Sequence, residues 1–189
     1  MYDIDMGDMM KLTLVRHGQT ESNFMEVCQG TGNILLNDTG RRQCKKLREK
    51  IENKHYDICY VSPLIRAVET AMILIGDKVQ MIPDKRLIDR DLGEFEGKDR
   101  ELYDAKLYWD YNLNCSDCGV EPVKEIFKRC EDFLNYVYEN NCGQNVLIVA
   151  HAATIRAIRH LVLNSDLSGN LLIRSIDNCY FEEIDLKNK

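Results

Sequence analysis

One histidine and its neighbours form a group that could attack phosphorus. Residues 12–15 are an apolar run, Leu-Thr-Leu-Val, that leads directly into Arg16, His17 and Gly18. A short run of this kind predicts a buried strand, and the glycine predicts a turn after it. A neutral imidazole beside a fixed cation can attack a phosphoryl group and carry it as phosphohistidine. Alone, however, a histidine in such a turn is more often a structural hydrogen-bond donor.

Arg66 follows a second apolar run and lies at the predicted start of a helix. The run covers residues 58–61 and is followed by Ser62 and Pro63, which suit the N-cap and the first position of a helix. Apolar residues then recur with helical spacing as far as Gly76, a predicted stop. Because a helix N-terminus attracts anions, Arg66 is a candidate phosphate ligand. For an isolated arginine, a solvated surface cation would be the more common role.

His151 occupies an equivalent place in the second half of the chain. A third apolar run, residues 146–150, ends directly in His151, and a helix is predicted to begin within a few residues. His17, Arg66 and His151 therefore each follow a predicted strand and lie at or near a helix start. In open α/β sheets, ligands bind at the carboxyl ends of the strands. We therefore expect the three side chains to meet at one edge of a sheet.

With these motifs in place, the sequence resembles the histidine phosphatase superfamily, in the branch of phosphoglycerate mutases and their phosphatase relatives. The resemblance extends from about Leu12 to about Ile184, and the motifs follow the family order. The matching segments are Arg16-His17-Gly18-Gln19-Thr20 with Asn23, residues 29–36 and 40–43, Ser62-Pro63-Leu64-Ile65-Arg66-Ala67, residues 87–97 and residues 146–156.

Two residues depart from the family pattern. Asp89 stands where this branch usually has Glu, which keeps a carboxylic acid but shortens its reach by one methylene. Ala152 stands where the family usually has Gly after the second histidine. Its backbone N–H can still point at phosphate, provided that its backbone angles suit a residue with a Cβ atom.

The resemblance implies that the protein hydrolyses a phosphomonoester in two steps. His17 attacks phosphorus and becomes phosphohistidine, while Asp89 protonates the leaving oxygen and then takes a proton from the attacking water. Fixed positive charge and hydrogen-bond donors do the electrostatic work that a metal usually does, so we expect no metal and no other cofactor. The residues expected to hold the phosphoryl oxygens are Arg16, Asn23, Arg66, His151 and Ala152.

Two other functions remain open. A phosphoglycerate mutase would use the same phosphohistidine for an isomerisation. Such mutases usually carry an additional arginine-tyrosine-proline segment after the acid-bearing loop, and residues 98–120 contain none. The other alternative is a non-catalytic domain that retains phosphate affinity, but the main catalytic positions are filled by competent residues. The sequence therefore favours a histidine-type phosphatase that acts on a small phosphorylated metabolite.

Length and composition are those of one soluble globular domain. The chain has 189 residues, of which 44% are hydrophobic and 30% charged. We expect a single domain over residues 11–189, preceded by a disordered N-terminal extension, residues 1–10. Those first residues are acidic and lack an apolar core, so they do not predict a signal peptide.

Charge and hydropathy restrict the partners and the location. The net charge of -6 disfavours nucleic acid or an anionic membrane as a main partner. All apolar runs fall well short of a membrane span. We therefore expect a cytoplasmic monomer or homodimer whose partner is its small-molecule substrate.

The eight cysteines predict neither a disulfide scaffold nor a metal site. Cys44, Cys59 and Cys130 fall at positions expected to face a core. Cys115 and Cys118 are the one suggestive pair, but a zinc site would need two more ligands, and the sequence shows no second pair. We expect reduced thiols without a chemical role.

The alternation of strands and helices predicts a three-layer α/β/α sandwich with a mainly parallel sheet, and the resemblance implies the same fold. In the family, the insertion corresponding to residues 98–120 caps the site and helps to select the substrate. Its tyrosines and Trp109 could equally pack a small satellite core. The expected strands are 12–15, 58–61, 79–82, 146–150 and 179–184, and the expected helices are 38–52, 63–75, 122–140 and 153–163.

Overall fold

A single sheet lies at the centre of the protein, and its parallel strands all end at the same edge. The structure, a computed structural model, describes residues 9–172 and 175–187. The strands of this part of the chain are β1 Met9–Arg16, β2 Ile58–Val61, β3 Met81–Pro83, β4 Asn145–Ala150 and β5 Phe181–Lys187. They follow the order β3-β2-β4-β1-β5, in which β5 is antiparallel to β1 and the other neighbours are parallel.

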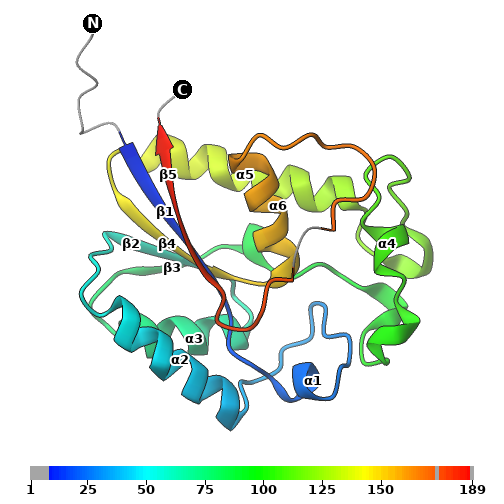
Figure 1. The fold of residues 1–189 in the computed structure, drawn as a ribbon, viewed down its shortest axis with the longest axis horizontal. Coiled ribbons are helices and arrows are strands. Elements are labelled where there is room, and N and C mark those ends of the chain that lie inside the picture. The colour runs from blue at the N-terminus through cyan, green and yellow to red at the C-terminus, as the bar shows by residue number, and fades with distance from the viewer. Residues whose placement is uncertain (1–8, 173–174, 188–189) are drawn as a thin grey trace, which may run out of the picture.

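Helices cover both faces of the sheet. The long helices of the described residues are α2 Asp38–Ile51, α3 Ile65–Ile75, α5 Val123–Asn140 and α6 Ala152–Val162. Helices α2 and α3 pack on one face, and α5 and α6 pack on the other (Figure 1). This arrangement confirms the predicted three-layer α/β/α sandwich. Within residues 9–172 and 175–187, no helix combines the length and apolar character needed to cross a membrane.

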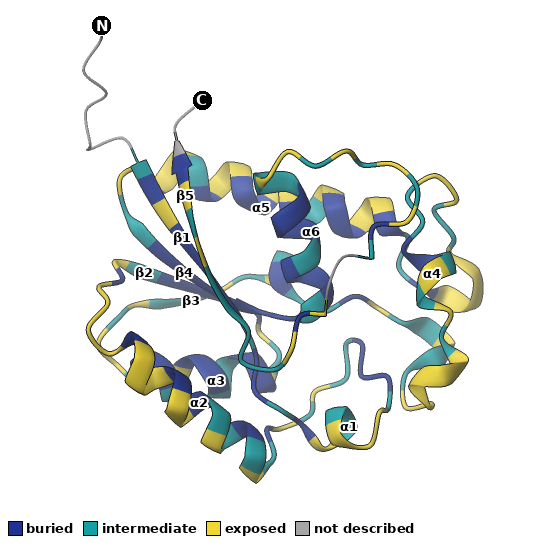
Figure 2. Cartoon of the chain, in the orientation of Figure 1, coloured by how far each residue is buried: buried dark blue, intermediate teal, exposed yellow. Residues whose placement is uncertain are grey.

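The central strands supply side chains to two separate hydrophobic clusters. Val146 and Ile148 of β4 belong to the cluster under α5 and α6, whereas Leu147 and Val149 belong to the cluster under α2 and α3. This follows from strand geometry, because successive side chains point to opposite faces of a sheet. Figure 2 shows the result as buried strands between helices whose exposed residues face outward. The near-continuous apolar runs of the sequence are therefore strands buried on both faces.

The α2 helix illustrates how the sequence pattern fixes a buried face. Cys44, Leu47 and Ile51 are all buried and recur at intervals of three and four residues. Asn37 caps the helix, since its side-chain oxygen accepts the backbone N–H of Gly40 at 2.8 Å. The positively charged residues of this helix occupy the remaining, largely exposed positions.

Two predicted boundaries are wrong at chemically relevant places. Helix α3 begins at Ile65 with Leu64 at its N-cap, so Ser62 and Pro63 lie before the helix. Strand β1 begins at Met9, and Met10 is buried within the core, so these two residues belong to the domain. Residues 1–8 of the expected N-terminal extension lie outside the described residues. Gly76 ends α3 as predicted, in a backbone conformation with φ of 58°.

The segment between the acid-bearing loop and α5 consists of short helical turns packed by aromatic side chains. It includes α4, Ala105–Tyr108, which lies with α1, Glu21–Phe24, beyond the end of the sheet where β1 ends (Figure 1). The rings of Tyr103 and Tyr108 are stacked 5.0 Å apart between centroids. Trp109 is buried and joins the cluster under α5 and α6. These aromatic residues therefore do pack a core, as the simpler interpretation predicted.

Candidate active site

Strand register brings the predicted site residues together. Arg16 at the end of β1 pairs with Ala150 at the end of β4, so the following residues, His17 and His151, are neighbours. Their ring centroids lie 5.1 Å apart. Strand β2 is the other neighbour of β4, and helix α3 after β2 carries Arg66 to the same edge. The three side chains meet at the carboxyl end of the sheet, as the strand-end pattern predicts.

His17 is held in one tautomer with a free nitrogen for nucleophilic attack. The ring is 1% exposed, and its Nδ1 lies 2.7 Å from the carbonyl oxygen of Gly18. A carbonyl can only accept, so Nδ1 carries the proton and Nε2 keeps its lone pair. Burial, with the nearby charges of Arg16 and Arg66, holds the pKa of His17 well below its usual 6.5. His17 is therefore a neutral imidazole.

The tautomer of His151 is fixed by its two neighbours. The Nε–H of Arg66 donates to Nδ1 of His151 at 3.2 Å. Because Nδ1 accepts, Nε2 carries the proton and donates to Oγ of Ser62 at 2.7 Å. Burial and the charge of Arg66 keep the pKa of His151 well below its ordinary value.

Arg66 is fully buried and held from several sides. Its Nη1 donates to the carbonyl oxygen of Gly32 at 2.6 Å, and its Nη2 donates to that of Gly30 at 2.8 Å. Nη2 also contacts Oδ2 of Asp89 at 3.2 Å. Burial lowers the pKa of Arg66, whereas Asp89 opposes that change. The guanidinium therefore contacts both His151 and the candidate acid before any substrate binds.

Asp89 lies in a loop held close to His151. Its Oδ2 is 3.7 Å from Nδ1 of His151. The loop is fixed by Nη1 of Arg129, which donates to the carbonyl oxygen of Ile88 at 2.9 Å. Oγ1 of Thr154, in the first turn of α6, donates to the same carbonyl at 2.7 Å. Thus Asp89 reaches the two-histidine centre despite being shorter than the glutamate usual in the family.

Arg16 supplies a second, partly buried cation. Its Nη1 donates to the carbonyl oxygen of Ile176 at 2.5 Å, while its Nε is buried without a hydrogen-bond partner among the described residues. Burial lowers the pKa of Arg16 to about 10, although Asp89 acts in the opposite direction. At neutral pH this group is still a cation with spare hydrogen-bonding capacity.

Asn23 is linked to the nucleophile through a residue that the sequence analysis did not identify. Its Oδ1 accepts the backbone N–H of Thr20 at 3.2 Å and Nδ2 of Asn178 at 3.1 Å. The same Nδ2 donates to the carbonyl oxygen of His17 at 3.1 Å. The structure therefore places Asn23 near the nucleophile turn, with its oxygen engaged in that link.

Ala152 is accommodated without backbone strain. It is the first residue of α6, and its φ is not positive. The N–H groups at a helix start have no partner within the helix, so this donor is available to an anion. The alanine that replaces the usual glycine thus fits the helical backbone.

Two further supporting residues escaped the sequence analysis. Ser62 was expected to cap a helix but instead accepts from His151. Its position directly after β2, the neighbour of β4, is the signal that would have placed it there. Thr70 lies one helical turn after Arg66, accepts the backbone N–H of Gly18 at 3.1 Å and donates to the carbonyl oxygen of Arg66 at 2.7 Å. It ties the nucleophile turn to α3.

The two cysteines in contact are not Cys115 and Cys118, the one pair that the sequence spacing suggested. The sulfur atoms of Cys44 and Cys179 lie 3.6 Å apart beside the nucleophile turn, where the backbone N–H of Cys179 donates to the carbonyl oxygen of His17. Cys115 is half-buried and Cys118 is exposed. Cys44, Cys59 and Cys130 are buried, which confirms that they face the core. Among residues 9–172 and 175–187, no group of three or more metal-ligating side chains is assembled.

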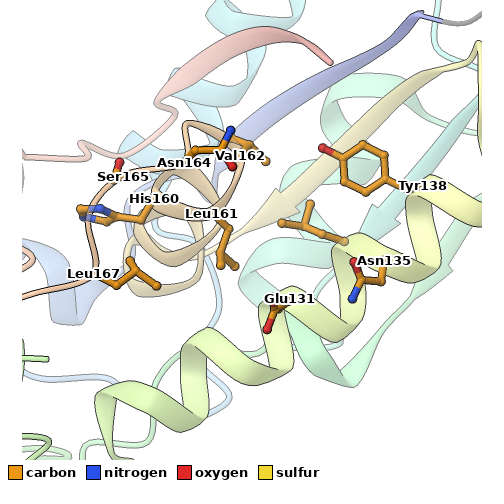
Figure 3. Close-up of a pocket in the computed structure, with 10 residues that line it drawn as sticks. Glu131, Asn135, Tyr138, His160, Leu161, Val162, Asn164, Ser165 and Leu167 are labelled. Atoms are coloured by element: carbon orange, nitrogen blue, oxygen red, sulfur yellow. The ribbon is translucent and has the colours of Figure 1, made fainter. Parts of the chain in front are cut away.

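A cavity of about 560 Å³ lies away from these residues. Figure 3 shows it between α5, which contributes Glu131, Asn135 and Tyr138, and the end of α6, which contributes His160 and Leu161. None of the predicted site residues lines it. The candidate active site is therefore the buried edge of the sheet and not this open cavity.

Comparison with known proteins identifies relatives over almost the whole chain. Residues 12–189 match the model of the histidine phosphatase superfamily (branch 1). The chain is 34% identical over 189 residues to putative phosphoserine phosphatase 2 of Hydrogenobacter thermophilus, with 96% of this chain and 92% of that protein covered. It is 34% identical over 181 residues to the uncharacterized phosphatase PhoE of Bacillus subtilis, with 93% and 90% covered.

A solved structure is also similar. It is a mutant of phosphoserine phosphatase from Entamoeba histolytica in complex with phosphoserine, which matches with a TM-score of 0.76 and 26% identity. The match covers 92% of this chain and 89% of that chain.

Proposed function

The chain belongs to the histidine phosphatase superfamily, branch 1, and is a phosphatase. From this premise we propose that it hydrolyses a small phosphomonoester, without a metal, through a phosphohistidine formed on His17. The observation that carries the proposal is the contact between Nδ1 of His17 and the carbonyl oxygen of Gly18. Because Nδ1 donates to this carbonyl, the lone pair of the neutral imidazole lies on Nε2, on the side of the ring away from the backbone. A free lone pair of this kind is what a nucleophile needs.

The first step transfers the phosphoryl group from the substrate oxygen to Nε2 of His17. The bond between phosphorus and the leaving oxygen breaks, and Asp89 in its protonated form gives that oxygen a proton. In the second step, the Asp89 carboxylate takes a proton from water, which attacks phosphorus and releases inorganic phosphate. Asp89 regains its proton in this way, and His17 is again neutral.

Positive charge around the phosphoryl group supports both steps. Arg66 is a buried cation and Arg16 a partly buried one, both on the same edge of the sheet as the nucleophile. His151 and the start of α6 add further donors. In a water-poor site, such fixed charges stabilise a transferring phosphoryl group far more than they would in bulk solvent. Arg16, Arg66, His151, Asn23 and Ala152 are therefore proposed as phosphate-binding residues.

A panel of phosphate esters, assayed in metal-free buffer, tests the proposal. A chromogenic ester such as p-nitrophenyl phosphate reports the basic reaction, and the names of the relatives make phosphoserine and 3-phosphoglycerate the first natural esters to compare. We expect inorganic phosphate as the product. Isomerisation of phosphoglycerate without phosphate release would identify a mutase, and phosphate binding without turnover of any ester would identify a binding domain.

A further inference from the structure

Two cysteine sulfurs lie in direct contact beside the nucleophile turn. Sγ of Cys44, in α2, is 3.6 Å from Sγ of Cys179, in the turn before β5. The two residues are 135 positions apart in the sequence, so only the fold brings them together. Both thiols are free. Because the S–S bond of a disulfide is about 2.05 Å long, a closure of about 1.5 Å would join the two sulfurs.

The two sulfurs differ in exposure and in acidity. Cys44 is fully buried, whereas Cys179 is partly exposed and gives solvent access to the pair. Burial alone raises the pKa of the equally buried Cys59 thiol to about 12. The pKa of Cys44 is instead lowered, because the thiol of Cys179 hydrogen-bonds to its sulfur. The first proton of the pair therefore leaves Cys44 more readily than it leaves an isolated buried thiol, and a thiolate is the reactive form of cysteine.

Both cysteines contact the backbone of the nucleophile turn. Sγ of Cys44 packs against Gly18 so closely that a Cβ atom on this glycine would lie 2.8 Å from the sulfur. The same sulfur is 3.7 Å from Oγ1 of Thr70, which accepts the backbone N–H of Gly18 at 3.1 Å. On the other side, the backbone N–H of Cys179 donates to the carbonyl oxygen of His17 at 3.2 Å. The cysteine pair thus contacts both residues of the turn that contains the nucleophile.

A closure of the two sulfurs would therefore displace the nucleophile. The carbonyl oxygen of Gly18 accepts Nδ1–H of His17 at 2.7 Å and so fixes the reactive tautomer. Cys179 is held in a left-handed backbone conformation, with φ of 56°, which a residue with a Cβ atom adopts only when its surroundings impose it. Because protein interiors are close-packed, a shift of this size at either cysteine is transmitted to the residues that it contacts.

We propose that Cys44 and Cys179 form an oxidative modification site, at which hydrogen peroxide converts the two thiols into a disulfide and lowers the phosphatase activity. The effect on activity rests on the proposed function. One sulfur attacks an oxygen of the peroxide, the O–O bond breaks, and a sulfenic acid and water form. The other sulfur then attacks the sulfenic sulfur, the S–S bond forms, and the hydroxyl group leaves as a second water. The two cysteines lose two electrons, which reduce the peroxide, and a dithiol reverses the change.

Peptide mapping and kinetics on the same samples test the proposal. The wild-type protein is treated with hydrogen peroxide, its remaining thiols are blocked with N-ethylmaleimide, and it is digested without a reductant. We expect a cross-linked pair of peptides that contain Cys44 and Cys179. The kcat for p-nitrophenyl phosphate should fall by about 10- to 100-fold, since a misplacement of about 1 Å in an active site can cost that much. Dithiothreitol should remove the cross-link and restore kcat.

Matched variants identify the sulfurs responsible. Cys179→Ser keeps the backbone N–H that donates to His17 but removes one sulfur, so it should retain the untreated kcat and lose the part of the inhibition that dithiothreitol reverses. Cys118→Ser removes an exposed thiol, and with it any bond to Cys115, and should remain as sensitive as the wild type. Should Cys179→Ser fold poorly, Cys44→Ala provides the same comparison, since each result is a ratio of treated to untreated protein from one preparation.

Three results would overturn the proposal. The first is the absence of a cross-link between Cys44 and Cys179 in the treated, folded protein. The second is a cross-link that leaves kcat unchanged, and the third is an equal reversible loss of activity in Cys179→Ser. If the untreated wild type hydrolyses no ester, the proposed function fails and the effect on activity fails with it. The peptide map then decides by itself whether the modification site exists.

Discussion

Arg66 and His151 form a hydrogen bond of 3.2 Å in which the guanidinium donates and the imidazole accepts. This contact determines where the proton of His151 resides, because a nitrogen that accepts from Arg66 cannot itself carry hydrogen in the neutral ring. It also holds a permanent cation beside His151. Both consequences bear on the predictions that follow.

Replacing the nucleophile should abolish the covalent intermediate. His17→Ala is expected to remove both hydrolysis and the labelling of the protein by a phosphate ester with radioactive phosphorus. In the wild type the label should be acid-labile and base-stable, as expected for a phosphohistidine. Substantial activity in the variant would contradict the mechanism, and His55→Ala, at an exposed histidine, serves as the control.

Removal of metal ions should leave the activity intact. The cations Arg16 and Arg66 already neutralise charge at the site, so dialysis against EDTA is expected to change kcat/KM for p-nitrophenyl phosphate by less than about twofold. A loss of activity that added zinc or magnesium reverses would show that the arginines do not replace a metal ion at this site.

The role of Asp89 predicts a dependence on the leaving group. Asp89→Asn keeps the size but removes the acid, so hydrolysis of an alkyl phosphate should slow by about 10²–10⁴-fold. Nitrophenolate needs little protonation, so its ester should lose much less activity. Equal losses for both esters would argue against leaving-group protonation, unless dephosphorylation limits both. Near-wild-type rates of Asp89→Asn with an alkyl phosphate would assign leaving-group protonation to a neighbouring carboxylate. Asp91→Asn is the matched control variant.

The buried histidines predict a loss of stability in acid. Burial holds the pKa of His17 and His151 well below 6.5, so the folded protein binds fewer protons than the unfolded chain once the pH falls below that value. The free energy of unfolding should therefore decrease as the pH drops from about 6.5 toward the folded pKa, by up to about 1.4 kcal/mol per pH unit for each histidine. Denaturant titrations at several pH values measure this slope. His151→Gln should reduce it, whereas His55→Gln should not.

A close backbone approach predicts a strong effect at Gly40. A Cβ atom there would lie 2.1 Å from the carbonyl oxygen of Gln19, a backbone atom two residues after the nucleophile. Gly40→Ala should therefore lower the free energy of unfolding by about 1–3 kcal/mol or shift the nucleophile turn. Chemical denaturation measures the first effect and kcat the second. Lys45→Ala, on the exposed side of α2, should change neither.

Local patterns predicted the elements and the main site residues, but not the contacts that depend on strand order. The apolar runs before His17 and His151 identify strands, and α2 is visible from Cys44, Leu47 and Ile51. The contact between Ser62 and His151 can be inferred only when β2 and β4 are known to be neighbours, and residues 62–144 separate these strands in sequence. Considered alone, Ser62 and Pro63 also suit a helix start. In the structure the Ser62 hydroxyl accepts a hydrogen bond from His151, and α3 begins only at Ile65.

The sequence analysis missed the stacking of Arg90 and Arg156 on Trp109 for a related reason. Arg90, Trp109 and Arg156 come from a loop, a short helical segment and a long helix, and no spacing rule connects them. Trp109 was recognised only as part of an aromatic cluster, and its burial agrees with that. Which cations stack on it depends on tertiary packing that a single sequence does not encode locally.

The carbonyl oxygens of Gly30 and Gly32 already accept hydrogen bonds from the guanidinium of Arg66 when no substrate is bound. Because His151 and Asp89 also accept from this guanidinium, the described residues leave one of its five N–H groups, on Nη1, without a partner. A phosphoryl group that accepts more than one hydrogen bond from Arg66 must therefore share or replace the existing partners. The measured affinity for phosphate will then be a difference between two similar interactions. Substitutions that loosen the loop around Gly30 and Gly32 can thus strengthen phosphate binding without contacting the phosphate. The same loop can speed product release, because its carbonyl oxygens can again accept hydrogen bonds from Arg66.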